Sequence, residues 1–294
     1  MKKQLVREQI VPIIIVSLLC IAILYPFLML VSASFSNEKD IIMHGFKLIP
    51  EHFDLAAYKV VFKNPKSIID AYKVTITFSV VGTVLALLIR ASAAYALSSP
   101  KLRQKNKFSF YFYFTMLFNG GLVPSYILIT QYLHLDDTIW VYILPTLVSP
   151  WHVFMLRTFF NNLPSSLHES MRLDGASEYT IFARLVLPLS KPAIATNALM
   201  TFLADWNNWN TAMLYINDQE LISLQYLLQK IIRDVEFLRN NAQNVGGMDL
   251  SGAEVPTTTM QMAMAMIAAG PVLVIFPFFQ KYFVKGLTVG SVKG

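Results

Sequence analysis

The chain has 294 residues, of which 55% are apolar and 14% are charged, and its mean hydropathy is +0.49. A soluble domain carries about a quarter charged residues, so the composition excludes an ordinary water-soluble enzyme and indicates lipid surroundings. The net charge of +6 does not indicate a nucleic-acid partner, because the lysines and arginines flank apolar segments and form no basic stripe.

The apolar residues gather in six long stretches, at about 10–33, 74–97, 108–130, 139–160, 192–214 and 260–283. Each is near the length of about 20 residues that a helix needs to cross the core of a bilayer. We therefore expect an all-α integral membrane protein with six transmembrane helices in a single domain over residues 1–294. The one cysteine, Cys20, excludes an intramolecular disulfide.

The first stretch also has features of a cleaved secretory signal. Two lysines precede it, and small residues end it at 32–34. The apolar region of a signal runs about 7–15 residues, whereas this one runs from Ile10 to Val31. A retained transmembrane helix is therefore the favoured interpretation.

The basic residues predict the orientation, because cytoplasmic connections retain lysine and arginine. They precede the first stretch and follow the second, fourth and sixth. The connection at 131–138 has none and holds Asp136 and Asp137 instead. Both termini are therefore expected in the cytoplasm. Arg90, inside the second stretch, is expected to extend its guanidinium towards the cytoplasmic surface.

The outer segment at about 217–257 is too elaborate for a simple connection. Its apolar residues recur at steps of three and four, which predicts a helix of about five turns with one apolar stripe. The stripe consists of Leu221, Leu224, Leu228, Ile231, Val235 and Leu238. We expect this helix to lie flat at the outer surface, for packing alone or for docking. A polar, glycine-rich loop follows at 240–256 and either binds a partner or is merely mobile.

The inner connection at about 164–188 carries signals for two short helices separated by a turn. Ser166, followed three residues later by Glu169, fits a capping box that starts the first helix. Asp174 and Gly175 fit the end of this helix, because glycine readily takes the left-handed conformation that closes one.

The second helix of this connection is expected to begin after Ser177, whose hydroxyl can cap it, and to end at Pro188. The two helices together should expose the apolar side chains of Leu167, Met171, Tyr179 and Phe182. An exposed apolar surface of this kind needs a partner.

This connection resembles the EAA loop of the permease subunits of binding-protein-dependent ABC importers, whose pattern is E-A-A-x-x-D-G-A-x-x-x-x-x-F-x-x-I-x-L-P. The matching residues are Glu169, Asp174, Gly175, Ala176, Phe182, Leu187, Pro188 and, beyond the pattern, Pro192. Ser170 and Met171 replace two alanines, and Leu185 replaces an isoleucine. The resemblance implies that an ATPase is contacted by Glu169, Met171, Asp174, Gly175, Ala176, Tyr179 and Phe182. For Glu169, helix capping alone is the alternative.

Other segments are similar to the carbohydrate-uptake group, including six-span permeases of the maltose-transporter type. Residues 202–210 resemble its Trp-Asn pattern, 119–124 resemble oligosaccharide permeases, and the tail 284–294 resembles an end that reaches between the ATPases. Candidate translocation residues are Asn119, Asp205, Asn207, Asn208 and Trp209, and candidate ATPase-interface residues are Lys285, Gly290 and Lys293. Hydrogen bonds between helices remain the alternative for the polar side chains, and an interfacial position remains the alternative for Trp209.

Motifs for chemistry on this chain are missing from its sequence. It has no G-x-x-x-x-G-K-[ST] loop for nucleotide phosphates, no G-x-S-x-G elbow and no H-E-x-x-H pair. The five histidines show no zinc-ligand spacing. We therefore expect a non-catalytic subunit with no catalytic residue, metal site or cofactor of its own.

The resemblance also implies the partners. These are a second homologous permease, two ABC ATPases that bind ATP and Mg, an extracytoplasmic sugar-binding protein and membrane lipid, in a bacterial cytoplasmic membrane. Candidate contacts with the binding protein are Gly247, Asp249, Ser251 and Glu254. The function that the resemblance implies is import of a carbohydrate by alternating access, with an oligosaccharide as the favoured substrate.

Two other classes of function fit the composition. A polytopic membrane enzyme acting on a glycan or a lipid-linked sugar is the main alternative, but the sequence shows no credible set of acid, base and metal ligands for it. A scaffold or receptor is the other, and it leaves the exposed helix pair at 164–188 unexplained.

Overall fold

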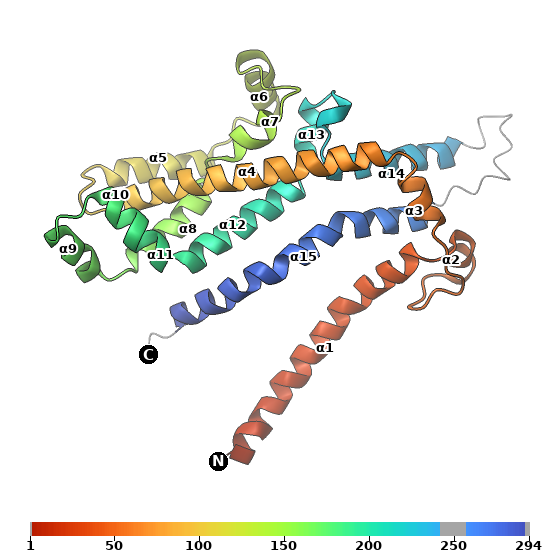
Figure 1. Cartoon of the computed structure of the whole chain (residues 1–294), viewed down its shortest axis with the longest axis horizontal. Helices are drawn as coiled ribbons and strands as arrows, with labels where there is room; N and C mark the ends of the chain where they lie inside the picture. The colour runs from red at the N-terminus through yellow and green to blue at the C-terminus, as the bar shows by residue number, and fades with distance from the viewer. Residues whose placement is uncertain (1, 242–256, 292–294) are drawn as a thin grey trace. The chain divides into compact units, whose positions relative to one another are not determined.

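The computed structural model describes the backbone of residues 2–241 and 257–291, and the side chains of 10–234, 236–237 and 257–277. Within these ranges the chain forms helices and connecting turns, with one isolated antiparallel bridge between Ser36 and Phe53 (Figure 1). It divides into two compact units. Unit 1 contains residues 1–65 and 228–271, and unit 2 contains 66–227 and 272–294.

Unit 1 is built from two long helices and short helices between them. Its elements are α1 (Lys2–Ser34), α2 (Glu38–His44), α3 (Ala56–Val61), most of α14 (Leu224–Asn241) and the first part of α15 (Thr258–Ser291). Phe35 stacks on Phe53 and Tyr58, with ring centroids 5.5 and 5.1 Å apart. These rings hold α3 and the bridge against the end of α1.

Glu38 joins α2 to α15 within unit 1. Its carboxylate accepts hydrogen bonds from the backbone N–H groups of Thr258 and Thr259, at 2.8 Å each, and from the hydroxyls of Thr257 and Thr259. Because the first N–H groups of a helix lack partners within it, this carboxylate caps the start of α15. Burial raises the pKa of Glu38, but these hydrogen bonds outweigh it and hold the pKa below its ordinary value.

Unit 2 contains the long helix α4 (Pro65–Ser98) from residue 66 onward and a series of shorter elements. These are α5 (Lys105–Leu117), α6 (Leu122–Ile127), η1 (Leu128–Tyr132), α7 (Trp140–Ile143), η2 (Leu144–Thr146), α8 (Pro150–Asn161), α9 (Ser165–Leu173), α10 (Glu178–Ile181), η3 (Phe182–Val186), α11 (Leu187–Leu189), α12 (Lys191–Trp206), α13 (Asn210–Tyr215) and η4 (Gln219–Leu221). The elements η1 and η3 are π-helical, and η2 and η4 are 3₁₀-helical.

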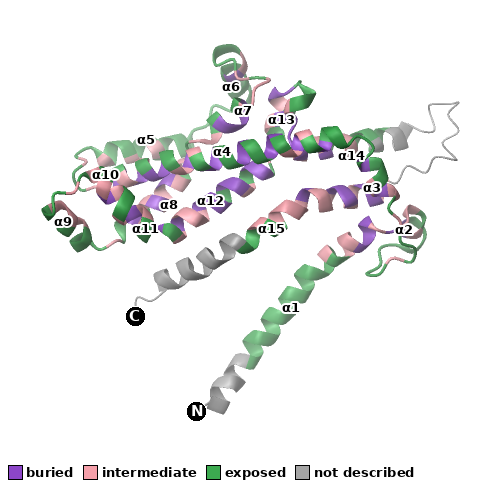
Figure 2. Cartoon of the chain, in the orientation of Figure 1, coloured by how far each residue is buried: buried purple, intermediate pink, exposed green. Residues whose placement is uncertain are grey.

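The core of unit 2 follows α4. Buried residues recur along one side of this helix and include Phe78, which stacks on Tyr142 of α7 with ring centroids 4.3 Å apart (Figure 2). One apolar cluster joins the first half of α4 to α7 and α13, and a second joins its last turns to α8, α10 and η3. The second cluster supports the base of the α9–α10 segment.

Fewer continuous spans are present than the sequence predicts. Among the described helices, three are long and apolar enough to cross a membrane, namely Ile10–Ser34, Pro65–Ser98 and Thr258–Pro277. A fourth crossing results if Lys105–Leu117 and Leu122–Tyr132 count as one span. The remaining predicted stretches are divided into shorter helices.

The predicted helix over 108–130 is interrupted between α5 and α6, where the chain bends by 110°. Gly121 takes a φ of +91°, which glycine adopts without strain. The side-chain oxygen of Asn119 accepts a hydrogen bond from the N–H of Gly121, at 2.8 Å. This local turn ends α5, so the prediction of one uninterrupted helix here is wrong.

The predicted helices over 139–160 and 192–214 are also divided. Pro150 is the first residue of α8 and has no N–H to continue the hydrogen bonds of the preceding segment. Helix α12 ends at Trp206, and the side chain of Asn208 then accepts a hydrogen bond from the N–H of Thr211, at 3.1 Å, near the start of α13. Each interruption is explained by residues at the break itself.

The outer segment contains the predicted amphipathic helix, as α14, which begins at Leu224, whereas Leu221 of the predicted stripe belongs to η4. Leu224 and Leu228 are buried, whereas Gln229, Arg233 and Asp234 are exposed. This division matches the predicted stripe for the first turns of the helix. The loop after α14 lies outside the described residues.

Candidate functional site

The connection between α8 and α12 forms two short helices, as predicted, at the end of unit 2 where α4 finishes (Figure 1). Helix α9 ends at Leu173, and Gly175 follows with a φ of +78°. The N–H of Ala176 donates to the carbonyl of Met171, at 2.9 Å, and closes the turn. The hydroxyl of Ser177 accepts a hydrogen bond from the N–H of Thr180 and caps α10.

The start of α9 differs from the prediction. The helix begins at Ser165 with Pro164 before it, and no side chain caps its N-terminus. Ser166 therefore lies inside the helix, and the predicted capping box with Glu169 is wrong. Proline has a fixed φ and no N–H to donate within a helix, so it ends the preceding segment at Pro164, two positions before the predicted cap at Ser166. Glu169 is exposed.

The exposed apolar surface of this segment is smaller than predicted. Leu173 and Tyr179 are 89% and 87% exposed, and Leu167 is 40% exposed. Met171 and Phe182 instead pack against the buried cluster of α4, α8 and η3, so their predicted exposure is wrong. The ring of Phe182 lies 5.1 Å from the ring of Tyr95 on α4. These two side chains anchor the segment, and the leucines and Tyr179 face outward.

Glu178 is a residue of this segment that the sequence patterns did not single out. Its carboxylate accepts hydrogen bonds from the hydroxyl of Tyr95 at 2.7 Å, from Nζ of Lys101 at 2.9 Å and from Nε of Arg172 at 3.2 Å. These hydrogen bonds, from Tyr95 first and Lys101 next, lower the pKa of Glu178 to about 2. We call this group of four residues the Glu178 network.

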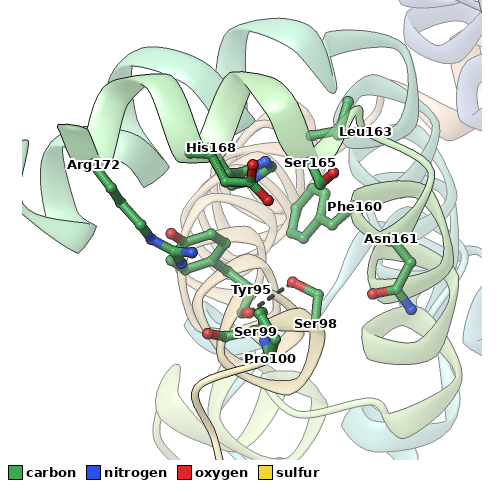
Figure 3. A pocket seen from close by; sticks show the side chains of 11 residues that line it. Tyr95, Ser98, Ser99, Pro100, Phe160, Asn161, Leu163, Ser165, His168 and Arg172 are labelled. Carbon is green, nitrogen blue, oxygen red and sulfur yellow. Dashed lines mark hydrogen bonds between the residues drawn. The ribbon is translucent and has the colours of Figure 1, made fainter. Parts of the chain in front are cut away.

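A pocket of about 170 Å³ lies beside this network (Figure 3). Phe160 and Leu163 contribute its apolar part, and His168, Glu169 and Arg172 reach it from α9. The remaining lining residues are Tyr95, Ser98, Ser99, Pro100, Asn161 and Ser165. Arg172 thus belongs both to the pocket and to the Glu178 network.

The candidate translocation residues do not form one site. Asp205 is buried on α12, at 4% exposure, whereas Asn207 and Trp209 are exposed and Asn208 is partly buried in the turn before α13. Asn119 is exposed at the bend after α5. The polar residues of 205–209 therefore divide into a buried acid and a more open cluster at the end of α12.

Asp205 lies against α4 at a close approach between the two helices. A Cβ atom added at Gly82 would lie 3.2 Å from Oδ2 of Asp205. No described residue donates a hydrogen bond to this oxygen, and the hydroxyls of Ser79 and Thr83 on the same part of α4 are buried without a partner among the described residues. This contact depends on the absence of a side chain at Gly82.

Arg90 does not extend towards the surface, contrary to the prediction. It is 2% exposed, and its guanidinium donates to the carbonyl oxygens of Thr146 and Leu147 and to the hydroxyl of Thr201. The first two acceptors lie where η2 ends before α8, a place where carbonyl groups lack helical partners. The planar guanidinium of arginine supplies several donors at once. Arg90 therefore provides hydrogen bonds to the carbonyl groups at this break and joins the break to α12.

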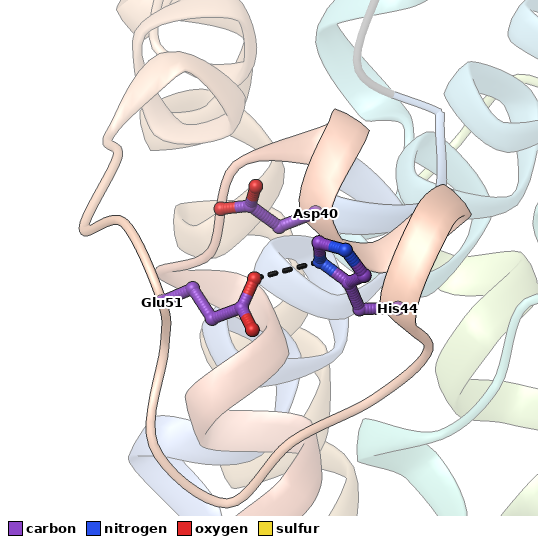
Figure 4. A group of neighbouring side chains, drawn as sticks. All are labelled: Asp40, His44 and Glu51. Atoms are coloured by element: carbon purple, nitrogen blue, oxygen red, sulfur yellow. Dashed lines mark hydrogen bonds and ion pairs between the residues drawn. The ribbon is translucent and has the colours of Figure 1, made fainter.

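A cluster in unit 1 has the residue types of a metal site. The possible ligand atoms of Asp40, His44 and Glu51 all lie within 4.8 Å of one another (Figure 4). Each carboxylate already has a protein partner, since Glu51 pairs with His44 and Lys47, and Asp40 pairs with His52. These pairs explain why the three side chains lie close together without a metal ion. The expectation of no metal site stays a prediction.

Other predicted contacts fall outside the described residues. The candidate binding-protein contacts Gly247, Asp249, Ser251 and Glu254 lie in the interval 242–256, and Lys293 lies beyond 291. Lys285 and Gly290 lie on the backbone of α15, beyond its described side chains.

Comparison with known proteins identifies similar membrane components. Residues 5–289 match the family model described as binding-protein-dependent transport system inner membrane component. The chain is 37% identical over 278 residues to the polygalacturonan/rhamnogalacturonan transport system permease protein YtcP of Bacillus subtilis, with 95% of this chain and 94% of that protein covered. It is 28% identical over 278 residues to the arabinooligosaccharides transport system permease protein AraQ of Halalkalibacterium halodurans, covering 92% and 91% of the two chains.

The fold also has a counterpart among solved structures. A chain from the crystal structure of a bacterial ABC transporter involved in the import of the acidic polysaccharide alginate superposes with a TM-score of 0.79 at 29% identity. The match covers 94% of this chain and 96% of that chain. None of these similarities supports the alternative of a membrane enzyme.

Proposed function

The chain belongs to the family of inner membrane components of binding-protein-dependent transport systems, and from this premise we propose that it imports an oligosaccharide or polysaccharide fragment. The names of the relatives support this substrate class, since one is a permease for polygalacturonan and rhamnogalacturonan and another is a permease for arabinooligosaccharides. The chain acts as a permease subunit, and ATP and Mg bind to separate ATPase subunits.

The proposed arrangement has six membrane crossings, some of them made from broken helices. The interrupted segments α7–α8 and α12–α13 count as one crossing each, because non-helical backbone is tolerated in a membrane where protein buries it or satisfies its polar groups. The hydrogen bonds of Arg90 to the break before α8 support this arrangement. The basic residues of the connections support cytoplasmic positions for both termini and for α9 and α10.

The observation that carries the proposal is the exposed helix pair α9–α10. Leu173 and Tyr179 are large apolar side chains that extend almost fully into the surroundings from a segment anchored by its other face. Such a surface is suited to a protein partner. We assign it to the ATPase, and the second permease and an extracytoplasmic binding protein complete the importer.

Transport by alternating access requires that ATP favour one conformation of the complex. A ligand shifts a conformational equilibrium only by the difference in its affinity for the two states. ATP binding changes the arrangement of the ATPases, and α9–α10 passes that change to the membrane helices. The tail around Lys285, Gly290 and Lys293 is assigned to the space between the ATPases.

For the sugar path, the exposed Asn207 and Trp209 and the neighbouring Asn208 are the favoured candidates. An aromatic face packs on the C–H groups of a sugar ring, and an amide both donates and accepts hydrogen bonds. Asp205 is buried against α4 and is better suited to helix packing in the described conformation. The loop at 246–256 is assigned to docking of the binding protein.

The proposal is tested with the complete importer in proteoliposomes. The chain is assembled with a second permease, an ABC ATPase and a sugar-binding protein from the same organism, and uptake of labelled oligosaccharides is measured together with ATP hydrolysis. We expect uptake that requires ATP and the binding protein. Fragments of alginate and polygalacturonan are compared with arabino-oligosaccharides to define the substrate.

Two results contradict the proposal. One is the absence of ATP-dependent uptake for every carbohydrate in a complex that hydrolyses ATP. The other is modification of a glycan by the isolated chain, which supports the membrane-enzyme alternative. Within a working importer, unchanged uptake after alanine replacement of Asn207, Asn208 and Trp209 returns these residues to a packing role.

A further inference from the structure

The Glu178 network joins three parts of the chain that are distant in sequence. Tyr95 belongs to the last turns of α4, Lys101 to the connection after it and Arg172 to α9, while Glu178 is the first residue of α10. The carboxylate oxygens lie 2.7 Å from the tyrosine hydroxyl, 2.9 Å from the lysine nitrogen and 3.2 Å from two nitrogens of the arginine. One carboxylate therefore links the end of α4 to both short helices.

The Glu178 network should hold its side chains more firmly than an ordinary surface ion pair does. An isolated exposed pair contributes roughly 0–1 kcal/mol, because solvent screens it and two flexible side chains must be held. Here three donors converge on one carboxylate, and the arginine side chain is 25% exposed. Hydrogen bonds to charged groups are the stronger ones, and members of a network reinforce one another.

Apolar contacts support the same connection from a second side. The ring of Tyr95, whose hydroxyl binds Glu178, also packs against Phe182 with centroids 5.1 Å apart. Helix α9 has no buried residue and is held to the unit through Met171, which packs against the buried cluster, and through Arg172. Few contacts hold α9, so each one has a large share in determining its position.

We propose that Glu178 is a positioning residue that transmits a displacement of α9 and α10 to α4. The inference rests on the proposed function, in which an ATPase moves this helix pair. Glu178 occupies an unspecified position of the EAA pattern, two residues after Ala176, so the pattern itself assigns it no role. The ATPase-facing side chains receive the displacement, and the Glu178 network carries it to a membrane-spanning helix.

The test uses the complete importer in proteoliposomes and measures sugar molecules imported per ATP hydrolysed. Glu178→Gln keeps the shape of the side chain and removes its charge, and Tyr95→Phe removes only one hydroxyl. We expect both variants to assemble and to hydrolyse ATP, with at least a threefold lower ratio of import to hydrolysis. If Glu178→Gln does not assemble, Tyr95→Phe and Lys101→Met decide the outcome.

A double variant tests whether Tyr95 and Glu178 act on the ratio of import to hydrolysis through their shared hydrogen bond. Because Tyr95 and Glu178 act through one hydrogen bond, Tyr95→Phe combined with Glu178→Gln should be no worse than Glu178→Gln alone. The matched control is Glu220→Gln, which breaks an exposed pair with Lys66, 3.5 Å apart, elsewhere in unit 2 and should leave the ratio unchanged.

The outcomes separate the inference from the proposed function. A wild-type ratio in Glu178→Gln, or additive losses in the double variant, overturns the positioning role while the importer itself still works. A wild-type complex without any uptake overturns the proposed function instead, since the ratio is then zero before any substitution.

Discussion

Two carboxylates of unit 2, Glu178 and Asp205, lie in opposite surroundings. Glu178 is 40% exposed at its side chain and has three donors, whereas Asp205 is 4% exposed and no described residue donates to its Oδ2. The first is held by side chains that can exchange their partners with water. The second is enclosed by close helix packing at Gly82. The comparison indicates that the α9–α10 region can rearrange locally, whereas the α4–α12 contact resists change as a whole.

The largest expected effect on the enclosed region comes from Arg90→Met. The substitution keeps a long apolar side chain but leaves two carbonyl oxygens and the hydroxyl of Thr201 without their donor. Leaving a buried neutral acceptor without its donor costs about 1–3 kcal/mol for each group. We expect a marked loss of thermal stability in detergent. Stability equal to wild type shows that the break before α8 does not depend on Arg90.

Gly82→Val tests the close approach directly. The added Cβ lies 3.2 Å from the Asp205 carboxylate, and the two methyl groups need further space. Overpacking of this kind costs about 1–3 kcal/mol. Gly120→Val is the control, since the contact at that exposed glycine is an ordinary 3.6 Å. We expect a lower unfolding temperature for Gly82→Val only, and equal shifts for the two variants contradict the packing argument.

Gly175→Val tests the exposed turn between α9 and α10. A Cβ atom meets nothing within 4 Å there, so the cost of about 1–3 kcal/mol comes only from the φ of +78°. Because the turn between α9 and α10 is a local structure, we expect sugar-stimulated ATP hydrolysis to fall while the unfolding temperature changes little. Gly175→Asn, which tolerates this conformation better, should retain more of the stimulation. Full stimulation in the valine variant removes the turn from the coupling mechanism.

The smallest effect is a response of the Glu178 network to pH. The pKa of Glu178 is about 2, below the ordinary value of a glutamate. The ionised carboxylate therefore stabilises the α9–α10 segment above about pH 4.5, and this stabilisation is lost as the pH falls towards 2. A nitroxide label at position 173, where Leu173 is exposed, reports the mobility of the turn. We expect constant mobility from pH 7 to 5 and an increase below about pH 4. Glu178→Gln should be mobile at every pH, and a label with identical pH dependence in both proteins contradicts the assignment.

Local signals predicted the local structures well. The glycine turn at 175 and the cap at Ser177 were predictable because each depends on neighbouring residues, and both are present. The capping box at Ser166 was wrong because the cap position of α9 is Pro164, two residues earlier. The breaks near Gly121 and Pro150 were visible as glycine and proline, but the length of the apolar stretches concealed them.

Contacts between distant segments were beyond the reach of these signals. Glu38, Arg90 and Glu178 each have partners more than 50 residues away, for which no local pattern exists. The same reason explains the wrong exposure of Met171 and Phe182, since the cluster that covers them is assembled from other helices. The family resemblance supplied the function, whereas the physical attachment of the coupling segment needed the structure.

The π-helical segment η3 (Phe182–Val186) makes the orientation of α10 sensitive to chain length. A π-helical turn contains one more residue than an α-helical turn, and each residue of an α-helix corresponds to a rotation of about 100°. A deletion of one residue within 182–186 that restores α-helical geometry would rotate α10 relative to α12 by about this angle. Tyr179 would then leave its outward direction without any change in composition. In this segment, single-residue insertions and deletions are therefore expected to be more harmful than most substitutions.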